Sequence, residues 1–302
     1  ASAATYHVAT TGSDAAAGSL AAPFLTVQHA VDTAVAGDTV LVGPGTYPEV
    51  VTTAASGTSG SRITIDGQGV ATMTKITISH SYVTLKNMTL MGALGDTSYH
   101  VYVNFGAHYL IVEDCLIDMG LVQYVDGIEW RLPGAGTVPY GDGSVASNCI
   151  IRRNTFQNGK GAHMVQIGGD DNLITDNIMK DGIAIDYFYL FGRRNTISMN
   201  RCTNNYALTG VGNHPDFVQT FGENGHGSID HIIEKNYCRD SINGAPWQLT
   251  KALCPDIGNW IIRYNLFMDM DIAGSSGIPD LTIHNNIFVR CNLLNVGHAM
   301  SW

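Results

Sequence analysis

The feature that most constrains this chain is a short pattern that recurs eight times between residues 83 and 288. Each copy places an Asn or Asp between apolar residues, as in Ile150–Phe156 and Ile261–Phe267. The Asn or Asp positions are Asn87, Asp114, Asn154, Asn177, Asn200, Asn236, Asn265 and Asn286. Repetition with a period of about 20 to 50 residues is typical of solenoids, in which each repeat buries its apolar face against its neighbours.

The spacings between these positions are 27, 40, 23, 23, 36, 29 and 21 residues. The shorter spacings fit one turn of a three-sided coil of short strands, and the longer ones fit the same turn with an inserted loop. Equivalent positions of neighbouring coils then stack about 4.8 Å apart in parallel ladders. We predict that the series from Asn87 to Asn286 is a structural ladder, because amides buried at a corner satisfy each other and the backbone groups of that corner.

The beginning of the chain differs from the repeats. Apolar residues there follow the i, i+3, i+4 spacing of a helix that Gly37 would end: Val27, Ala30, Val31, Ala34 and Val35. An amphipathic helix at this point would close the open end of a solenoid. We therefore expect one domain over residues 1–302, with a cap and the first strands in residues 1–50 and repeat coils in residues 51–302.

The composition excludes several classes of protein. Charged residues make up 14% of the chain, the formal net charge is −10, and the sequence has no basic tract. Binding to nucleic-acid phosphates is therefore not expected. No run of about 18 apolar residues is present, so insertion into a membrane is not expected. Many Gly, Ser, Thr and Asn residues with few lysines fit an extracellular or periplasmic protein, or a virion-associated one. The sequence leaves the oligomeric state open.

Five segments and the repeats carry a resemblance to a known family. The segments are Tyr6–Asp14, Pro23–Gln28, Ala36–Tyr47, Ser56–Ile65 and Ser81–Leu85. The chain resembles right-handed parallel β-helix proteins of the pectate-lyase-like superfamily. The resemblance implies an all-β fold, a single-stranded right-handed parallel β-helix with an N-terminal amphipathic helix cap. It also implies a carbohydrate-active protein without fixing the reaction, because this superfamily holds lyases, hydrolases, epimerases and viral tailspikes.

The strand before each Asn or Asp position repeats polar residues at its first and fourth positions. Successive coils read Asp126–Glu129, His163–Gln166, Asp186–Tyr189, Asp216–Gln219 and Ala245–Gln248. Both positions face outward only if a bend interrupts the alternation of the strand, and we predict such a bend. The alternative is that Gln166, Gln219 and Gln248 form an amide ladder inside the coil.

The sharpest cluster of titratable residues lies around Pro215, which fixes the backbone between His214 and Asp216. Asp186 lies one coil earlier and His163 one coil before that. Stacking would bring the two carboxylates to about 5 Å from each other, where they share a proton, bind a cation, or serve as nucleophile and acid. We expect the catalytic residues to be Asp186, Asp216, His214 and His163, with Lys251 as a base.

The residues around this cluster suit the binding of a polysaccharide. Aromatic rings pack against the apolar faces of sugar rings, while carboxylates and amides bond to sugar hydroxyl groups. We expect the substrate-binding residues to be Asp126, Glu129, Trp130, Gln166, Tyr189, Gln219, Trp247 and Gln248.

Three functions fit these residues. The first is a lyase that cleaves a uronic-acid-containing glycan by β-elimination, which needs a base and a group that neutralises the substrate's charge. Because a chain of net charge −10 repels a polyanion, this function implies Ca²⁺, held by Asp126, Asp186 and Asp216. The second is a glycoside hydrolase with paired carboxylates, and the third is a non-catalytic glycan-binding or tailspike module. The resemblance favours the lyase, and no organic cofactor is expected.

Overall fold

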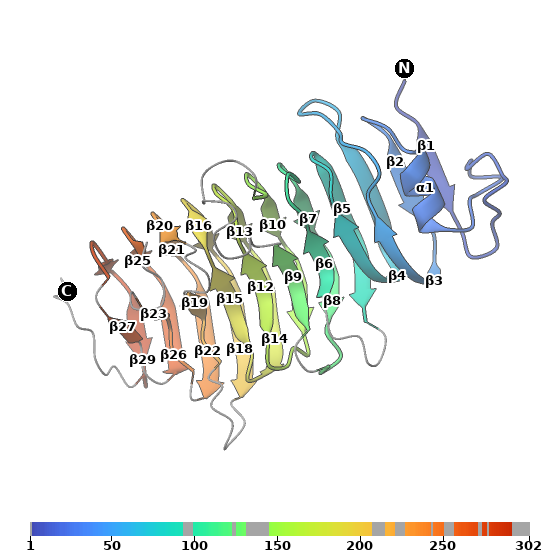
Figure 1. Cartoon of the computed structure of the whole chain (residues 1–302). Helices are drawn as coiled ribbons and strands as arrows, with labels where there is room; N and C mark the ends of the chain where they lie inside the picture. Colours follow the sequence, from blue (N-terminus) through green and yellow to red (C-terminus); the bar gives the residue numbers. More distant parts are fainter. Residues whose placement is uncertain are drawn as a thin grey trace.

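The computed structural model of the chain describes residues 2–92, 99–122, 125–130, 145–206, 215–220, 227–242, 244–250, 257–270, 274–276 and 278–291. Its strands lie side by side in an elongated stack, from β1 (Thr5–Val8) at one end to β29 (Ile287–Val289) at the other (Figure 1). Twenty-six of them belong to one continuous network, and every pairing between its named strands is parallel. The predicted parallel β-helix is therefore confirmed.

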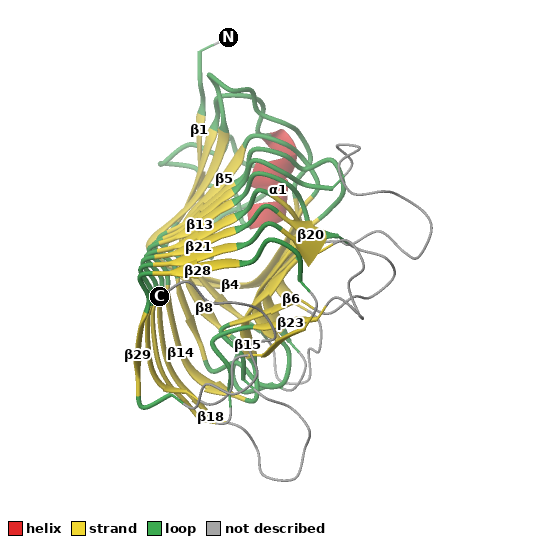
Figure 2. Ribbon diagram, turned by 90° about the vertical axis from the view of Figure 1, so that its left-hand side faces the viewer, coloured by secondary structure: helices red, strands yellow, loops and turns green. Residues whose placement is uncertain are grey.

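The corners of each coil divide this network into three faces, which Figure 2 shows end-on as superposed strands. After β1, the first face contains β2 (Thr39–Val42), β7 (Ile111–Glu113), β10 (Ile150–Arg152), β13 (Leu173–Thr175), β17 (Thr196–Ser198), β21 (Ile232–Glu234), β25 (Ile261–Arg263) and β28 (Thr282–His284). Before β29, the second face contains β3 (Gly45–Thr52), β8 (Leu116–Asp118), β11 (Thr155–Gln157), β14 (Ile178–Ile183), β18 (Arg201–Tyr206), β22 (Tyr237–Ile242) and β26 (Leu266–Met270).

The third face carries the candidate functional site. It contains β6 (Tyr99–Val103), β9 (Asp126–Trp130), β12 (His163–Ile167), β15 (Asp186–Leu190), β19 (Val218–Thr220), β23 (Gln248–Thr250) and β27 (Gly274–Ser276). Two long strands run through corners, because β4 (Ile63–Ile78) pairs with strands of all three faces and β5 (Val83–Met91) with strands of two. A separate small sheet joins β16 (Gly192–Arg193), β20 (Ser228–Ile229) and β24 (Ile257–Gly258).

Apolar side chains stack inside the coil at one position per turn. On the first face the central residues of six successive strands, β7 to β25, face inward and are at most 2% exposed: Val112, Ile151, Ile174, Ile197, Ile233 and Ile262. Burying one such side chain stabilises the fold by about 1.5–3 kcal/mol. β-Branched residues also suit a pleated strand, so the same residues favour the strand and fill the core.

The asparagine ladder is present, but it starts later than the sequence predicts. It runs through Asn154, Asn177, Asn200, Asn236, Asn265 and Asn286. From Asn177 onward, each side-chain oxygen accepts from the backbone N–H and the side-chain amide of the preceding member at 2.9–3.1 Å. Cys115 takes the equivalent inward position one coil earlier, and its N–H donates to Asn154. Asn87 and Asp114 lie one residue before the ladder, with φ of 51° and 56°. Their inclusion in the ladder was wrong, because Asn and Asp also favour this left-handed corner conformation.

The predicted N-terminal helix is α1 (Val27–Thr33), which lies beside β1 and β2 at one end of the stack (Figure 1). Thr26 caps it by accepting a hydrogen bond from the N–H of His29. The helix buries Val27, Ala30 and Val31, but Val35 lies beyond its end and is exposed. Its closing of the solenoid end stays a prediction.

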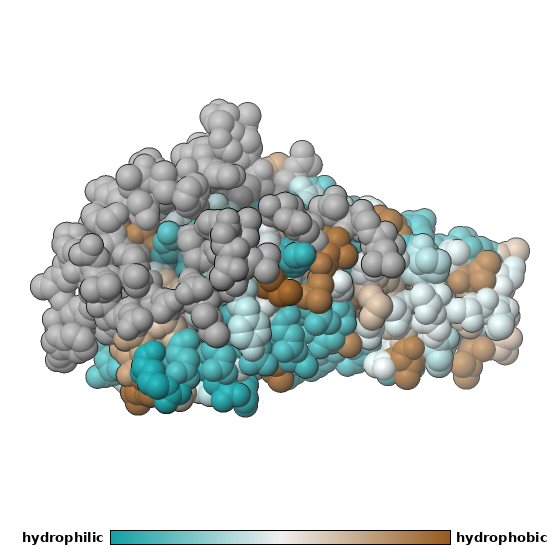
Figure 3. All heavy atoms as spheres, turned by 90° about the horizontal axis from the view of Figure 1, so that it is seen from below, coloured by the Kyte–Doolittle hydropathy of each residue, from teal (hydrophilic) through white to brown (hydrophobic). Residues whose placement is uncertain are grey.

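The surface of the described residues is mixed in character. Figure 3 shows small groups of hydrophobic residues among hydrophilic ones over the described part of one side. In the described ranges, no helix is long and apolar enough to span a membrane.

Candidate functional site

Two rows of polar side chains run along the third face. The first-position row consists of Asp126, His163, Asp186 and Asp216, which follow one another from coil to coil. The fourth-position row consists of Glu129, Gln166, Tyr189, Gln219 and Gln248. The strands thus bring together the residues that the sequence analysis selected on this face.

A break in the strand pairing explains how both rows form. The pairing between β12 and β15 skips the position of Met164, and the pairing between β6 and β9 skips the position of His100. Asp126 and Glu129 are both partly exposed, although regular alternation would place positions i and i+3 on opposite sides. The break agrees with the predicted bend.

His163 is held by the preceding coil. Its Nδ1 lies 3.0 Å from Oδ1 of Asp126, and the same oxygen accepts the backbone N–H of His163 at 2.9 Å. The ring of Tyr189 stacks on the imidazole, with centroids 4.3 Å apart and planes 5° from parallel. Burial alone would lower the pKa of His163, but Asp126 and, at longer range, Asp186 and Glu129 raise it above its ordinary value. The structure therefore favours an oriented, positively charged imidazole.

Glu129 is the unusual carboxyl group of the third face. It is partly buried and makes no hydrogen bond or ion pair within the residues that the structure describes. Burial, together with the negative charge of Asp126, raises its pKa to about 7 despite the opposing effect of His163. A carboxyl with this pKa gains and loses a proton near neutral pH, which suits a general acid or base.

The aspartates of the first-position row tie neighbouring coils together. Oδ1 of Asp186 accepts the backbone N–H of Asp216 at 2.9 Å, and Oδ1 of Asp216 accepts that of Ala245 at 2.8 Å. Asp186 is 8% exposed and Asp216 is 1% exposed. The two lie on adjacent coils, as the sequence predicts. Their burial and backbone bonds favour a structural role, and catalysis by these two aspartates stays a prediction.

The glutamines of the fourth-position row bond to neighbouring coils. Nε2 of Gln166 donates to the carbonyl oxygen of Trp130 at 3.0 Å, and Nε2 of Gln219 donates to Oε1 of Gln248 at 2.5 Å. Gln219 and Gln248 are partly exposed rather than inside the core. Substrate binding by these amides stays a prediction.

The two tryptophans predicted to bind sugar are not exposed on the third face. Trp130 and Trp247 are each 1% exposed and belong to the hydrophobic core. Trp130 also donates its indole N–H to the carbonyl oxygen of Ala146 at 2.9 Å. These two predictions were wrong, because both side chains occupy inward positions of the strand pattern. The neighbouring coils place Val103 and Ile167 beside Trp130 and Val218 beside Trp247, and all three are buried.

Two predicted catalytic residues, His214 and Lys251, lie outside the described residues. The predicted calcium ligands are described residues. Among the described residues, no group of three or more His, Cys, Asp and Glu side chains is arranged to hold a metal ion. Oδ1 of Asp186 and Oδ1 of Asp216 accept backbone N–H groups, and Oδ1 of Asp126 bonds to His163. Calcium binding by these three carboxylates stays a prediction.

Three residues that were not predicted from the sequence lie two or three coils before His163. Tyr99 and Tyr102 stack with centroids 4.6 Å apart, and Nζ of Lys75 lies 5.2 Å from the Tyr99 ring. Tyr102 pairs in register with Glu129. The available signal was the spacing of Tyr99 and Tyr102, which matches that of Asp126 and Glu129.

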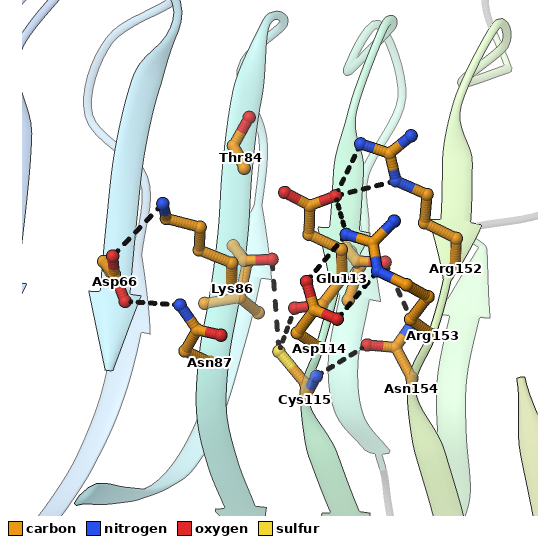
Figure 4. Close-up of polar contacts among 12 residues, drawn as sticks. Asp66, Thr84, Lys86, Asn87, Glu113, Asp114, Cys115, Arg152, Arg153 and Asn154 are labelled. Carbon is orange, nitrogen blue, oxygen red and sulfur yellow. Dashed lines mark hydrogen bonds and ion pairs between the residues drawn. The ribbon is translucent and has the colours of Figure 1, made fainter. Parts of the chain in front are cut away.

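A second group of charged residues follows the corner of the first face (Figure 4). Lys86 lies 3.2 Å from Asp66, and Arg153 forms a two-bond contact with Asp114 at 2.7 and 2.8 Å. Glu113 receives Arg152 and Arg153 together. Every charged group in this cluster has a partner of opposite sign, which describes a coil-to-coil tie rather than a reactive site.

Comparisons with solved structures agree with the fold. The chain aligns with an alginate lyase from Paenibacillus sp. strain FPU-7 at a TM-score of 0.69 and 15% identity, covering 99% of both chains. It aligns with pectate lyase Pel9A at 0.71 and 14% identity, covering all of this chain and 79% of that one. A rhamnogalacturonan lyase gives 0.64 and 16%, with 98% and 83% covered.

These similarities define the class of protein as a parallel β-helix. The resemblance noted from the sequence is therefore confirmed at the level of the fold. No family model and no curated protein sequence matches the chain.

Proposed function

We propose that the protein is a polysaccharide lyase that cleaves a uronic-acid-containing glycan by β-elimination along the third face. The observation that carries the proposal is Glu129, a partly buried carboxyl without a partner among the described residues, whose pKa is raised to about 7. It lies on the same strand as Asp126 and one coil from His163, the imidazole that Asp126 holds. A base and a cation on neighbouring coils are the two groups that the elimination requires.

In the proposed reaction, Glu129 removes the proton from the ring carbon next to the substrate's carboxylate. The electron pair of that C–H bond forms a C=C bond, and the bond between the next ring carbon and the glycosidic oxygen breaks. The oxygen leaves with the bonding electrons and takes up a proton from solvent. His163 stabilises the negative charge that builds on the substrate carboxylate during proton removal.

Two neighbours position His163 for this role. Asp126 bonds to Nδ1 and keeps the imidazole charged, which leaves Nε2 to contact the substrate. Tyr189 fixes the plane of the ring by stacking on it. This arrangement supplies a cation without a metal ion, and no step of the reaction uses calcium.

The solved lyases with the same fold support the proposal through their names, which specify alginate, pectate and rhamnogalacturonan. All three are polymers with carboxylate-bearing sugars. A substrate of this kind implies an extracellular or periplasmic protein, and that location is part of the proposal.

The second candidate is a glycoside hydrolase, which the electrostatic coupling of Glu129 to Asp126 favours. A carboxyl with a raised pKa beside a carboxylate is the arrangement of an acid and its nucleophile or base. The pair first considered from the sequence, Asp186 and Asp216, is less suited because both carboxylates bond to backbone N–H groups.

One assay separates these functions. The protein is incubated with alginate, polygalacturonate, rhamnogalacturonan and a neutral galactan, and each reaction is read for new reducing ends and for the ultraviolet absorbance of an unsaturated sugar. The lyase produces both signals on an acidic glycan, and Glu129→Gln removes them. Reducing ends without absorbance would establish the hydrolase, whereas glycan binding without either signal would establish a binding module.

A further inference from the structure

The polar rows of the third face continue past Glu129 toward the N-terminus as aromatic residues. Tyr102 pairs in register with Glu129, and Tyr99 pairs with Asp126. Both tyrosines are partly exposed, and their rings are 28° from parallel with centroids 4.6 Å apart. The two rings therefore extend the surface that holds the proposed base by one coil, or about 4.8 Å.

A lysine completes this group from the coil before. Lys75 lies on β4 directly before Ile76, which pairs with Val101, and its Nζ is 5.2 Å from the Tyr99 ring centroid. Oγ1 of Thr77, on the same strand, lies 3.4 Å from the hydroxyl oxygen of Tyr99. The Lys75 ammonium group, the Thr77 hydroxyl and the two tyrosines thus lie on two neighbouring coils.

Lys75 is a positive charge on a face whose other charged side chains are mainly carboxylates. Across the described strands of this face it is the one lysine or arginine, while Asp126, Glu129 and Asp186 contribute carboxyl groups. The whole chain carries a net charge of −10, so a polyanionic glycan approaches this surface against repulsion. A cation beside the reactive residues offsets that repulsion at one defined position.

We propose that Lys75, Tyr99 and Tyr102 form a subsite that binds one uronate residue of the glycan next to the residue on which Glu129 acts. Lys75 pairs with the carboxylate of this uronate, and the two tyrosines supply ring surface and hydroxyl groups to the sugar. The subsite rests on the proposed function, since it assumes a uronate polymer along the third face. It predicts that the protein selects its substrate partly by the charge of a sugar that does not react.

The alternative is that the three residues only stabilise their coils through stacking and cation–π contacts, which are worth about 0.5–1.5 kcal/mol each. Binding measurements distinguish the two, because a structural role changes the melting temperature without changing glycan selectivity.

The first test measures binding by calorimetry in the Glu129→Gln background, which prevents cleavage. The probes are tetrasaccharides of galacturonate and of mannuronate, with a neutral galactose tetrasaccharide for comparison. Replacing Lys75 by Gln is expected to raise the Kd for the bound uronate about 10- to 100-fold and to leave neutral binding unchanged. Lys75→Arg keeps the charge and is expected to retain most of the affinity.

The matched control for charge is Lys180→Gln. Lys180 lies on β14 of the second face, where its Nζ is 3.7 Å from Asp181, and its loss changes the net charge equally. If Lys180→Gln weakens uronate binding as much as Lys75→Gln, the effect comes from net charge and the subsite is wrong.

The chain also offers a matched control for the tyrosine stack. Tyr82 and Tyr109 stack with centroids 4.6 Å apart where the chain enters the first face. Tyr102→Leu is expected to weaken uronate binding, whereas Tyr82→Leu leaves it unchanged. Melting curves of all variants show which of them remain folded, and Tyr102→Leu keeps the subsite testable if Lys75→Gln does not fold.

The outcomes separate the subsite from the function on which it rests. Wild type that cleaves a uronate polymer, with Lys75 and Tyr102 variants that bind as tightly as their controls, overturns the subsite alone. No binding of any uronate tetrasaccharide overturns the subsite and the proposed lyase together. Selective loss of uronate affinity in the Lys75 variant supports both.

Discussion

The buried asparagine ladder and the polar residues of the third face both follow the axis of the solenoid, and they differ in how completely their polar groups are hydrogen-bonded. In the buried ladder, the side chain of Asn200 accepts from Asn177 and donates to the carbonyl oxygen of Ile174. On the third face, Glu129 makes no such bond among the described residues, although it is partly buried. Repetition along the helix axis is common to both rows and therefore does not identify a site.

In a repeat protein, structural polar residues can therefore be distinguished from reactive ones by whether their polar atoms are all hydrogen-bonded. A buried polar group costs free energy unless it is paired, so a complete ladder stabilises the fold. A buried polar group without a partner retains this free-energy cost, and binding a substrate or a proton can offset it. Glu129 is in this state. The paired charges of Figure 4 belong with the ladder by this criterion.

Removing the unpaired carboxyl is expected to have the largest effect on activity. Glu129→Gln keeps the shape of the side chain and abolishes its basicity, so kcat should fall by about 10²- to 10⁴-fold. The matched change Glu234→Gln, on a first-face carboxylate paired with Arg263 at 2.7 Å, should leave kcat unchanged. Steady-state kinetics on the acidic glycan that the protein cleaves measures both, and an unaltered kcat in the Glu129 variant would falsify its role as base.

Breaking the saturated ladder is expected to have the largest effect on stability. Asn200→Ala leaves the carbonyl of Ile174 and the N–H of Asn177 unpaired inside the coil. The free energy of unfolding should fall by about 3–5 kcal/mol, measured by urea denaturation. Asn286→Ala removes the last described member of the ladder and should cost less, because only Asn265 on one side bonds to it through the ladder. Equal losses at the two positions would contradict a cooperative ladder.

The pH dependence of activity should report both ionisable groups of the site. Glu129 acts as a base only when ionised, so activity should rise as the pH passes through its pKa of about 7. His163 acts as a cation, and because its pKa is raised, activity should persist at pH values above the ordinary pKa of histidine. Asp126→Asn removes the charge that raises this pKa, so the alkaline limb of the profile should move to lower pH. An alkaline limb that stays in place would remove His163 from the reaction.

Glu129 should also make stability depend on pH. Its folded pKa of about 7 lies above the ordinary value of 4.5, so the carboxyl stabilises the fold while protonated at low pH. That contribution is lost as the pH rises through 7. Glu129→Gln should therefore be more stable than wild type at pH 8, by about 1–2 kcal/mol after allowing for solvent screening, and should show no gain at pH 4. Urea melts at the two pH values test this difference.

The smallest expected effect is that of metal removal. The cation at the proposed site is an imidazolium, and Asp126, Asp186 and Asp216 already bond to His163 or to backbone N–H groups. EDTA should change neither the melting temperature nor kcat. A loss of activity that added Ca²⁺ restores would return the aspartates to the role of ligands.

The sequence predicts the fold well because a solenoid repeats its information. The Asn positions from Asn154 onward predict the ladder, since the same residue must meet its copies in every coil. Asn87 and Asp114 mislead by one residue, because their side chains suit both the ladder and the left-handed corner beside it. A pattern that tolerates a shift of one residue does not fix the register by itself.

The candidate site is less readable from sequence, because reactivity depends on burial and pairing rather than on residue type. Asp216 and Glu129 look equally available in the sequence, but only the structure shows that Asp216 bonds to a backbone N–H in the core. The prediction for Trp247 failed for a similar reason, because residue type alone does not show whether an aromatic side chain faces the core or the solvent.

The ladder has a further consequence for how such a protein can change over evolutionary time. Asn177 and Asn200 are 23 residues apart and Asn200 and Asn236 are 36 apart, yet the backbone bond that joins each pair is 3.0 Å long in both cases. The second turn is thirteen residues longer than the first, yet the hydrogen bond from the backbone N–H to the next asparagine's side-chain oxygen has the same length. Insertions and deletions between ladder members are thus nearly neutral for the scaffold. New substrate preferences can arise by lengthening a single turn while the framework that supports the chemistry stays the same.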